Sequence, residues 1–118
     1  MDTPVQSAAS KVNDVVSVEK HGNVALVALN NPPVNAASQA LRQGIHQAVS
    51  DLQENPGIKA IGLYGEGRTF IAGADIREFG KPPQDPWLPD LCNFLENSET
   101  PIACIIHGTA LGGGLEVA

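Results

Sequence analysis

Three consecutive glycines, Gly112–Gly114, constrain the fold of this chain more than any other feature of its sequence. They follow an apolar run at 102–107, which predicts a buried strand, and a carboxylate, Glu116, comes shortly after them. Glycine allows a sharp turn and lets a ligand approach the backbone with no Cβ in the way. If a helix begins in this run, its first N–H groups are unpaired and favour negative charge. The stretch therefore indicates an anion-stabilising backbone beside an acid–base group.

Composition limits the class of protein and its partners. A chain of 118 residues, 42% of them hydrophobic, forms one domain at most and has enough apolar side chains for a core. The net charge of -6 argues against nucleic acid or an anionic membrane as the main partner. No run approaches the roughly 18 apolar residues of a transmembrane helix, and the first residues lack the basic and apolar regions of a secretory signal. We expect a soluble, intracellular protein without membrane insertion.

Cysteine and histidine do not point to a metal site. Cys92 and Cys104 both lie within apolar patterns, so we predict buried thiols, with a disulfide between them as the alternative. Thiols favour a reducing compartment. The three histidines, His21, His46 and His107, are not spaced as metal ligands.

The first half of the chain predicts a hairpin and a helix. Residues 1–14 are polar and rich in small side chains, and we expect a disordered tail. Alternation from Val15 and an apolar run at 24–29 flank turn residues at 21–23, which predicts a β-hairpin. Ser38 is a suitable N-cap for a helix to about residue 55. Its apolar residues recur on one helical face: Leu41, Ile45, Ala48, Val49 and Leu52.

The second half alternates short apolar strands with helical segments. The run at 58–64 predicts a strand, and the stretch at 81–89, with four prolines, predicts a mobile surface loop. Apolar spacing from Leu88 predicts a helix to about residue 98, and the strand at 102–107 follows. Helices alternating with strands are typical of an α/β domain with right-handed crossovers and a largely parallel sheet.

Three segments resemble one known family. Phe70–Ile76 and Gly108–Glu116 resemble the two signature segments of the enoyl-CoA hydratase/isomerase (crotonase) superfamily, and Asn31–Ala36 resembles the start of the same family. The chain is most similar to the hydratase part of multifunctional β-oxidation enzymes, which continue into a 3-hydroxyacyl-CoA dehydrogenase. The resemblance covers roughly residues 15–118. It implies a crotonase-like (ClpP/crotonase) β-β-α superhelix, of which 15–118 would form the N-terminal half of an incomplete hydratase domain.

The resemblance also implies a site. In this family an acyl-CoA thioester carbonyl lies between two backbone N–H groups, which correspond here to Ala74 and Gly113. Glu116 corresponds to the first of two glutamates that act on the water, and the second lies about twenty residues further along in the family pattern. The implied catalytic residues are Glu116, Gly113 and Ala74; the implied substrate-binding residues are Ala72, Gly73, Ala74, Asp75, Ile76, Arg77, Gly112 and Gly113. Hydration needs no cofactor or metal; NAD would enter only with a following dehydrogenase domain.

Simpler interpretations stay open for single residues. The glycines can serve as a tight strand-to-helix connection, and Glu116 as a helix N-terminal carboxylate placed for the dipole. Asp75 suits a turn or cap, and Arg77 suits solvated surface charge as well as a CoA phosphate. Trp87 either covers the acyl pocket or anchors its loop.

Three functions remain to be separated. The first is an enoyl-CoA hydratase that converts trans-2-enoyl-CoA to 3-hydroxyacyl-CoA. The second is an enoyl-CoA isomerase of the same superfamily. The third is an inactive fragment, which self-associates because its last helical turn has nothing to pack against. A homo-oligomer is the other possible multimeric state. The family implies an acyl-CoA partner, and a cytoplasmic location if the source is bacterial or a peroxisomal one if it is eukaryotic.

Overall fold

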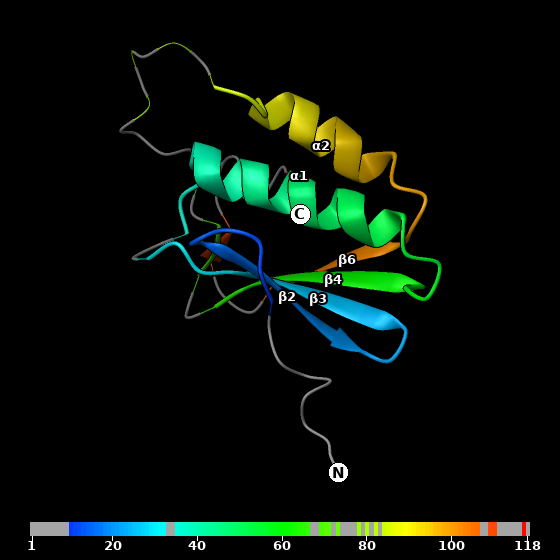
Figure 1. The fold of residues 1–118 in the computed structure, drawn as a ribbon. Helices are drawn as coiled ribbons and strands as arrows, with labels where there is room; N and C mark the ends of the chain where they lie inside the picture. The colour runs from blue at the N-terminus through cyan, green and yellow to red at the C-terminus, as the bar shows by residue number, and fades with distance from the viewer. Residues whose placement is uncertain are drawn as a thin grey trace.

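The protein folds into a sheet with two helices on one face (Figure 1). The structure is a computed structural model, and it describes residues 10–32, 35–66, 69–71, 73, 78, 80, 82, 84–106, 109–110 and 117. Five strands lie in the order β1-β2-β3-β4-β6, and β5 and β7 form a second, two-stranded sheet. The elements are β1 (Ser10–Lys11), β2 (Val16–His21), β3 (Val24–Leu29), α1 (Gln39–Gln53), β4 (Ala60–Gly65), β5 (Thr69–Ile71), α2 (Leu88–Glu96), β6 (Ile102–Ile105) and β7 (Thr109–Ala110).

The predicted hairpin is confirmed. β2 and β3 are antiparallel, with Val16 opposite Leu29 and His21 opposite Val24. Gly22 takes a φ of 64°, a conformation that glycine adopts without strain, at the turn between them. The predicted tail at 1–14 is wrong for its last part, because Ser10 and Lys11 pair with β2 as a short edge strand. Residues 1–9 lie outside the part of the chain that the structure describes.

Helix α1 follows the sequence prediction closely. The Ser38 hydroxyl accepts a hydrogen bond from the Leu41 N–H at 3.2 Å, which caps the helix as expected. The five apolar residues of the predicted face are all buried in the core against the sheet. Helix α2 also lies on this side of the sheet, and the His46 and Phe94 rings stack between the two helices at a centroid distance of 4.1 Å.

The main sheet is mixed rather than largely parallel. β3, β4 and β6 are parallel neighbours, whereas β1, β2 and β3 are antiparallel neighbours. The N-terminal hairpin accounts for the difference, because two strands joined by a short turn must run in opposite directions.

Two local expectations in the second half are wrong. The run at 102–107 does not form a fully buried strand: β6 lies at the edge of the sheet, and Ile105 and Ile106 are 48% and 47% exposed. The proline-rich stretch is exposed, but its carbonyl groups at 84–86 are hydrogen-bonded to α1, and α2 already begins at Leu88. The predicted loop is therefore too long at its C-terminal end, and its mobility stays a prediction.

Candidate active site

The three segments that carry the predicted site all begin at the carboxyl ends of parallel strands. β3, β4 and β6 run in the same direction, so the chain leaves all three at one edge of the sheet. The asparagine-proline motif follows β3, the first signature segment follows β4, and the glycine-rich stretch follows β6. Ligands of open α/β sheets bind outside this edge, where the loops diverge.

Two asparagines shape the loop after β3. Asn35 is buried and has a positive φ of 53°, a conformation that asparagine tolerates better than most residues. Its side-chain oxygen accepts from the Asn31 N–H at 2.7 Å, and the Asn31 side chain donates to the Ala36 carbonyl at 2.9 Å. The Asn35 amide also donates to the Glu66 carbonyl at 3.4 Å, which joins this loop to the one after β4. The motif at 31–36 therefore has a local structural function.

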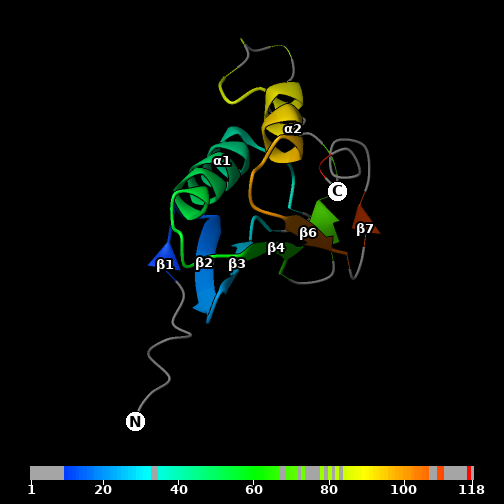
Figure 2. The same ribbon diagram turned by 90° about the vertical axis from the view of Figure 1, so that its right-hand side faces the viewer.

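The two signature segments meet in the small sheet. β5 pairs in parallel with β7, with Thr69 opposite Thr109 and Ile71 opposite Ala110. Figure 2 shows this sheet beyond β6, on the side of the main sheet away from β1. Ala74 and Gly113 each come three residues after a paired position, Ile71 and Ala110 respectively. The pair nearer the predicted donors is therefore equally distant from both in the sequence, and the register shifts between this pair and the one at Thr69 and Thr109.

The chain at the start of α1 is hydrogen-bonded to Gly73, within the first signature segment, and to Glu78, two residues beyond that segment. The Ala37 N–H donates to the Gly73 carbonyl at 2.7 Å, and the Gln39 N–H donates to Glu78 Oε2 at 2.7 Å. Gly73 has a φ of 129°, which few residues other than glycine adopt. Of the eight predicted substrate-binding residues, Gly73 is the one that the structure describes, and it lies at this attachment.

Sequence analysis missed Arg42, which connects this region. Arg42 is buried, with only 7% of its surface exposed, and its Nη1 donates to the Ala37 carbonyl at 2.6 Å and to Glu78 Oε1 at 3.1 Å. Its Nε donates to the Pro86 carbonyl at 2.7 Å, and its Nη2 to the Gln84 carbonyl at 3.2 Å. The available signal was a charged residue directly beside the apolar face of α1, but the sequence does not show which groups it contacts.

Most predicted site residues lie outside the described part of the chain. These are Ala72, Ala74, Asp75, Ile76, Arg77, Gly112, Gly113 and Glu116. The residue after Glu116 is described: Val117 is helical, only 8% exposed and part of the core. Its carbonyl lies 3.8 Å from Cys104 Sγ on β6. The expectation that this helical turn has nothing to pack against is therefore wrong.

Trp87 does not anchor the proline-rich loop. Its side chain is 55% exposed, and the loop is held instead by the side chains of Arg42 and Gln39, the latter donating to the Asp85 carbonyl at 2.7 Å. The other interpretation, contact with the acyl chain, stays a prediction.

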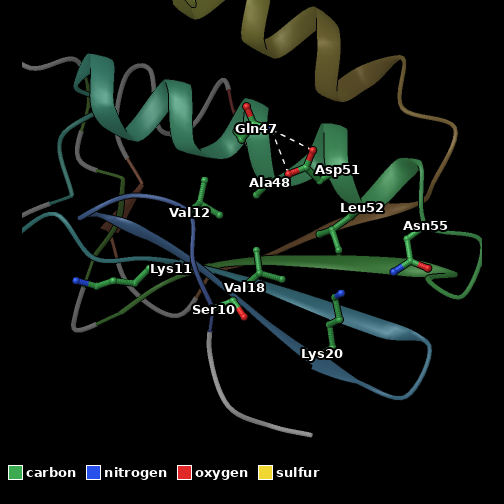
Figure 3. A pocket seen from close by; sticks show the side chains of 10 residues that line it. All are labelled: Ser10, Lys11, Val12, Val18, Lys20, Gln47, Ala48, Asp51, Leu52 and Asn55. Atoms are coloured by element: carbon green, nitrogen blue, oxygen red, sulfur yellow. Dashed lines mark hydrogen bonds between the residues drawn. The ribbon is translucent and has the colours of Figure 1, made fainter.

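A cavity of about 550 Å³ lies elsewhere, between α1 and the β1–β2 edge (Figure 3). Its apolar floor includes Val18 and Leu52, and Lys11, Lys20 and Asp51 stand at its rim. Asp51 accepts two hydrogen bonds from Gln47, its neighbour on the helix. None of the ten lining residues belongs to the three motifs, so this cavity is not the candidate active site.

Two titratable groups on β6 and β4, the strands that lead to the site, have raised pKa values. Both cysteines are thiols, as predicted, but each is only partly buried, so the expected full burial is wrong. Partial burial raises the pKa of the Cys104 thiol, which keeps it protonated at neutral pH. Burial, followed by the charges of Glu66 and Glu19, raises the pKa of Tyr64.

Within the described residues, no cluster of His, Cys, Asp and Glu is arranged to hold a metal ion. Neither of the two described helices is long and apolar enough to cross a membrane.

Comparison with known proteins identifies the class. The family model for enoyl-CoA hydratase/isomerase matches residues 19–118. The chain is 44% identical over 96 residues to a peroxisomal bifunctional enzyme of Danio rerio, covering 81% of this chain and 13% of that protein. It is 39% identical over 102 residues to a probable enoyl-CoA hydratase of Bacillus subtilis, covering 80% of this chain and 40% of that protein.

A solved structure has the same fold. It is an enoyl-CoA hydratase/carnithine racemase from Magnetospirillum magneticum, which superimposes with a TM-score of 0.83 at 28% identity, over 93% of this chain and 44% of that one. The chain belongs to the enoyl-CoA hydratase/isomerase family, and the expected crotonase-like α/β fold is confirmed. The chain spans less than half the length of these relatives.

Proposed function

We propose that this chain supplies the first part of an enoyl-CoA hydratase active site, which adds water to trans-2-enoyl-CoA. The observation that carries the proposal is the parallel pairing of β5 with β7, which joins the two signature segments three residues before Ala74 and Gly113. Membership of the family supports an acyl-CoA substrate, and two relatives are named for enoyl-CoA hydratase or bifunctional peroxisomal activity.

Two backbone N–H groups would carry the electrostatic part of catalysis. Water adds to C3 of the enoyl group, and negative charge develops on the thioester oxygen as an enolate. Ala74 and Gly113 N–H groups would donate to that oxygen, and a site closed to water would make them more effective. Loss of one such donor costs about 3–4 kcal/mol in comparable sites. Backbone donors need a defined path rather than large side chains, which suits alanine and glycine at these positions.

Glu116 would hold and orient the attacking water and accept its proton. A second carboxylate, expected about twenty residues beyond Glu116 from the family pattern, would return a proton to C2, so that the full reaction would use both carboxylates. Hydration by these groups uses no metal or redox cofactor, and NAD would belong only to a separate dehydrogenase domain. We propose that the active unit is the complete protein that contains residues 1–118.

The test is hydration of crotonyl-CoA by that complete protein, followed by loss of the enoyl absorbance. We expect Glu116→Gln to lower kcat at least a hundredfold, roughly 3 kcal/mol in barrier height. Glu54→Gln, an exposed glutamate at the end of α1, is the matched control and should retain full activity. Normal turnover by Glu116→Gln would remove Glu116 from the mechanism.

The isomerase alternative has its own assay. A wild-type protein that converts 3-enoyl-CoA to 2-enoyl-CoA, but does not hydrate crotonyl-CoA, would refute the hydratase assignment and leave the family assignment intact.

A further inference from the structure

We infer that Arg42 is a positioning residue: with Glu78 it clamps the first signature segment to the start of α1 and so fixes the Ala74 N–H in the oxyanion site. The inference rests on the proposed function, which assigns that N–H to the enolate oxygen. Arg42 itself contacts no reacting atom in this account.

The clamp has two attachment points: Ala37, just before the Ser38 N-cap, and Gln39, the first residue of α1. Gly73 is held through its carbonyl by the Ala37 N–H, and Glu78 is held through its carboxylate by the Gln39 N–H. Residues 74–77 lie between Gly73 and Glu78 in the sequence. The Gly73 carbonyl and the N–H of the next residue, Ala74, belong to one planar peptide unit, so a hydrogen bond to the carbonyl restrains the direction of that N–H. Arg42 acts on this attachment through the Ala37 carbonyl.

Glu78 also supplies a negative charge at the start of α1, whose own first turn has none. The first turn of α1 contains no acidic residue, although unpaired N–H groups there favour a negative charge. Ser38 satisfies the Leu41 N–H, and the Glu78 carboxylate satisfies that of Gln39. A carboxylate 39 residues along the chain thus completes the helix cap, which couples the order of the helix start to the position of the signature segment.

Arg42 joins the two attachments through one nitrogen. Its Nη1 donates to the carbonyl of Ala37, the residue that holds Gly73, and to the Glu78 carboxylate. Nε and Nη2 bind the Pro86 and Gln84 carbonyls, so all three guanidinium nitrogens are engaged. A planar guanidinium can make these bonds at once because its donors point in fixed directions in one plane. Lysine keeps the charge, but its ammonium is a single point of attachment and cannot reproduce the set.

Loss of the clamp should act on the chemical step. An oxyanion donor is effective only within about 2.7–3.1 Å of the developing charge. A displacement of about 1 Å can cost roughly a hundredfold in rate. Because the enolate charge exists in the transition state and not in the bound substrate, kcat should fall while KM changes little. A merely structural role would lower the amount of folded protein without changing kcat per folded active site.

The experiment compares Arg42→Lys and Arg42→Met with wild type in the complete protein that contains this chain, and Gln43→Ala on the exposed face of α1 is the control. Two quantities are measured on folded, quantified protein: kcat and KM for crotonyl-CoA, and hydrogen exchange at the Ala37 and Gln39 amides. We expect Arg42→Lys to lower kcat roughly tenfold to a hundredfold, with KM within about threefold of wild type. Exchange at both amides should accelerate about tenfold or more, since each is a donor to the clamped segment.

The outcomes separate this inference from the proposed function. Wild-type kcat in a folded Arg42→Lys variant would overturn the inference, as would unchanged exchange at both amides. A kcat loss that is equal in Gln43→Ala would also overturn it. A wild-type protein without hydratase activity would refute the proposed function and, with it, the effect of the clamp on catalysis. Accelerated amide exchange in Arg42→Lys would in that case still show that Arg42 holds the segment. Should Arg42→Met fail to fold, Arg42→Lys alone decides.

Discussion

Replacing Gly44 with alanine should destabilise the protein, although the change improves the helix propensity of α1. At an open position in a helix interior, alanine is favoured over glycine by about 1 kcal/mol. Gly44, however, lies where α1 crosses the start of β2, and a Cβ built on it would come within 2.5 Å of Val16 Cγ2 and 2.8 Å of Val16 Cβ. Carbon atoms in favourable contact are about 3.5–4.0 Å apart. Packing, rather than helix propensity, should therefore determine whether Gly44→Ala raises or lowers the free energy of unfolding.

The groups that the new methyl group meets cannot easily move. Val16 Cβ is attached to a strand that is paired with β3. The third contact, Asn13 Nδ2 at 2.8 Å, belongs to a side chain that donates to the Ala40 carbonyl at 2.8 Å. The same side chain accepts from the Val15 and Val16 N–H groups at 3.0 and 2.9 Å. Relief of the clash must therefore shift α1 away from the sheet or break these bonds.

The magnitude follows from these opposing effects. Overpacking of this kind costs about 1–3 kcal/mol, and loss of a part-buried hydrogen bond adds about 1 kcal/mol. After the propensity gain of about 1 kcal/mol is subtracted, we expect a net destabilisation of about 1–3 kcal/mol. For a domain of this size that lowers Tm by roughly 4–10 °C.

Thermal unfolding at one protein concentration measures the effect, and two further comparisons interpret it. Gln43→Gly compared with Gln43→Ala, at an exposed interior position of α1, should cost about 1 kcal/mol and calibrates propensity in this helix. Val16→Ala removes Cγ2, so Gly44→Ala should cost at least about 1 kcal/mol less in that background than in wild type. A Gly44→Ala protein with Tm equal to or above wild type would refute the close packing of α1 on β2.

Three other outcomes follow from the exposed edge, the proposed mechanism and the partly buried thiol of Cys104. The isolated 118-residue chain should self-associate, because β6 is an edge strand and Ile105 and the following Ile106 are about half exposed; light scattering after size exclusion should show multimers that Ile105→Lys reduces, and a monomer would contradict this. The same chain should hydrate crotonyl-CoA negligibly, because the proposed reaction uses a second carboxylate about twenty residues beyond Glu116; turnover equal to that of the complete protein would contradict this. In a Cys92→Ser background, alkylation of Cys104 should require a higher pH than alkylation of an unhindered thiol, because burial raises its pKa from 9.0. Since the folded protein then prefers the protonated thiol, its contribution to stability is complete below pH 9.0 and is lost as the pH rises further; an alkylation midpoint at or below that of a free thiol would contradict the burial.

Local chemistry made α1 and the hairpin predictable. Ser38, the repeating apolar face and the Asn55-Pro56 end signal act within a few residues of one another, and the structure places the helix at Gln39–Gln53. The turn at Gly22 likewise needs only its neighbours. Such elements can be inferred from one sequence because the interactions that define them are close along the chain.

The parts that could not be predicted depend on distant partners. Ser10 and Lys11 have no strand pattern of their own, and they are extended because the β2 edge offers hydrogen-bonding partners. The apolar run of β6 suggests burial, yet burial depends on which strands flank it, and its place at the edge leaves Ile105 exposed. The pair formed by Arg42 and Glu78 joins residues 36 apart in the sequence, with no periodicity to link them.

The difference between short-range patterns and long-range contacts explains why only part of the candidate site could be predicted from the sequence. The residues proposed to stabilise charge are alanine and glycine, whose spacing within each signature segment is a short-range pattern. Small residues cannot hold themselves in place, however, because they have no side-chain groups with which to do so. In this fold the holding groups are the carbonyl of Gly73, the carboxylate of Glu78 and the guanidinium of Arg42, and they converge at the start of a helix whose own sequence lacks the charge it needs. The short-range motifs therefore indicate the proposed donors, whereas the side chains inferred to position them can be named only when the contacts of α1 are known.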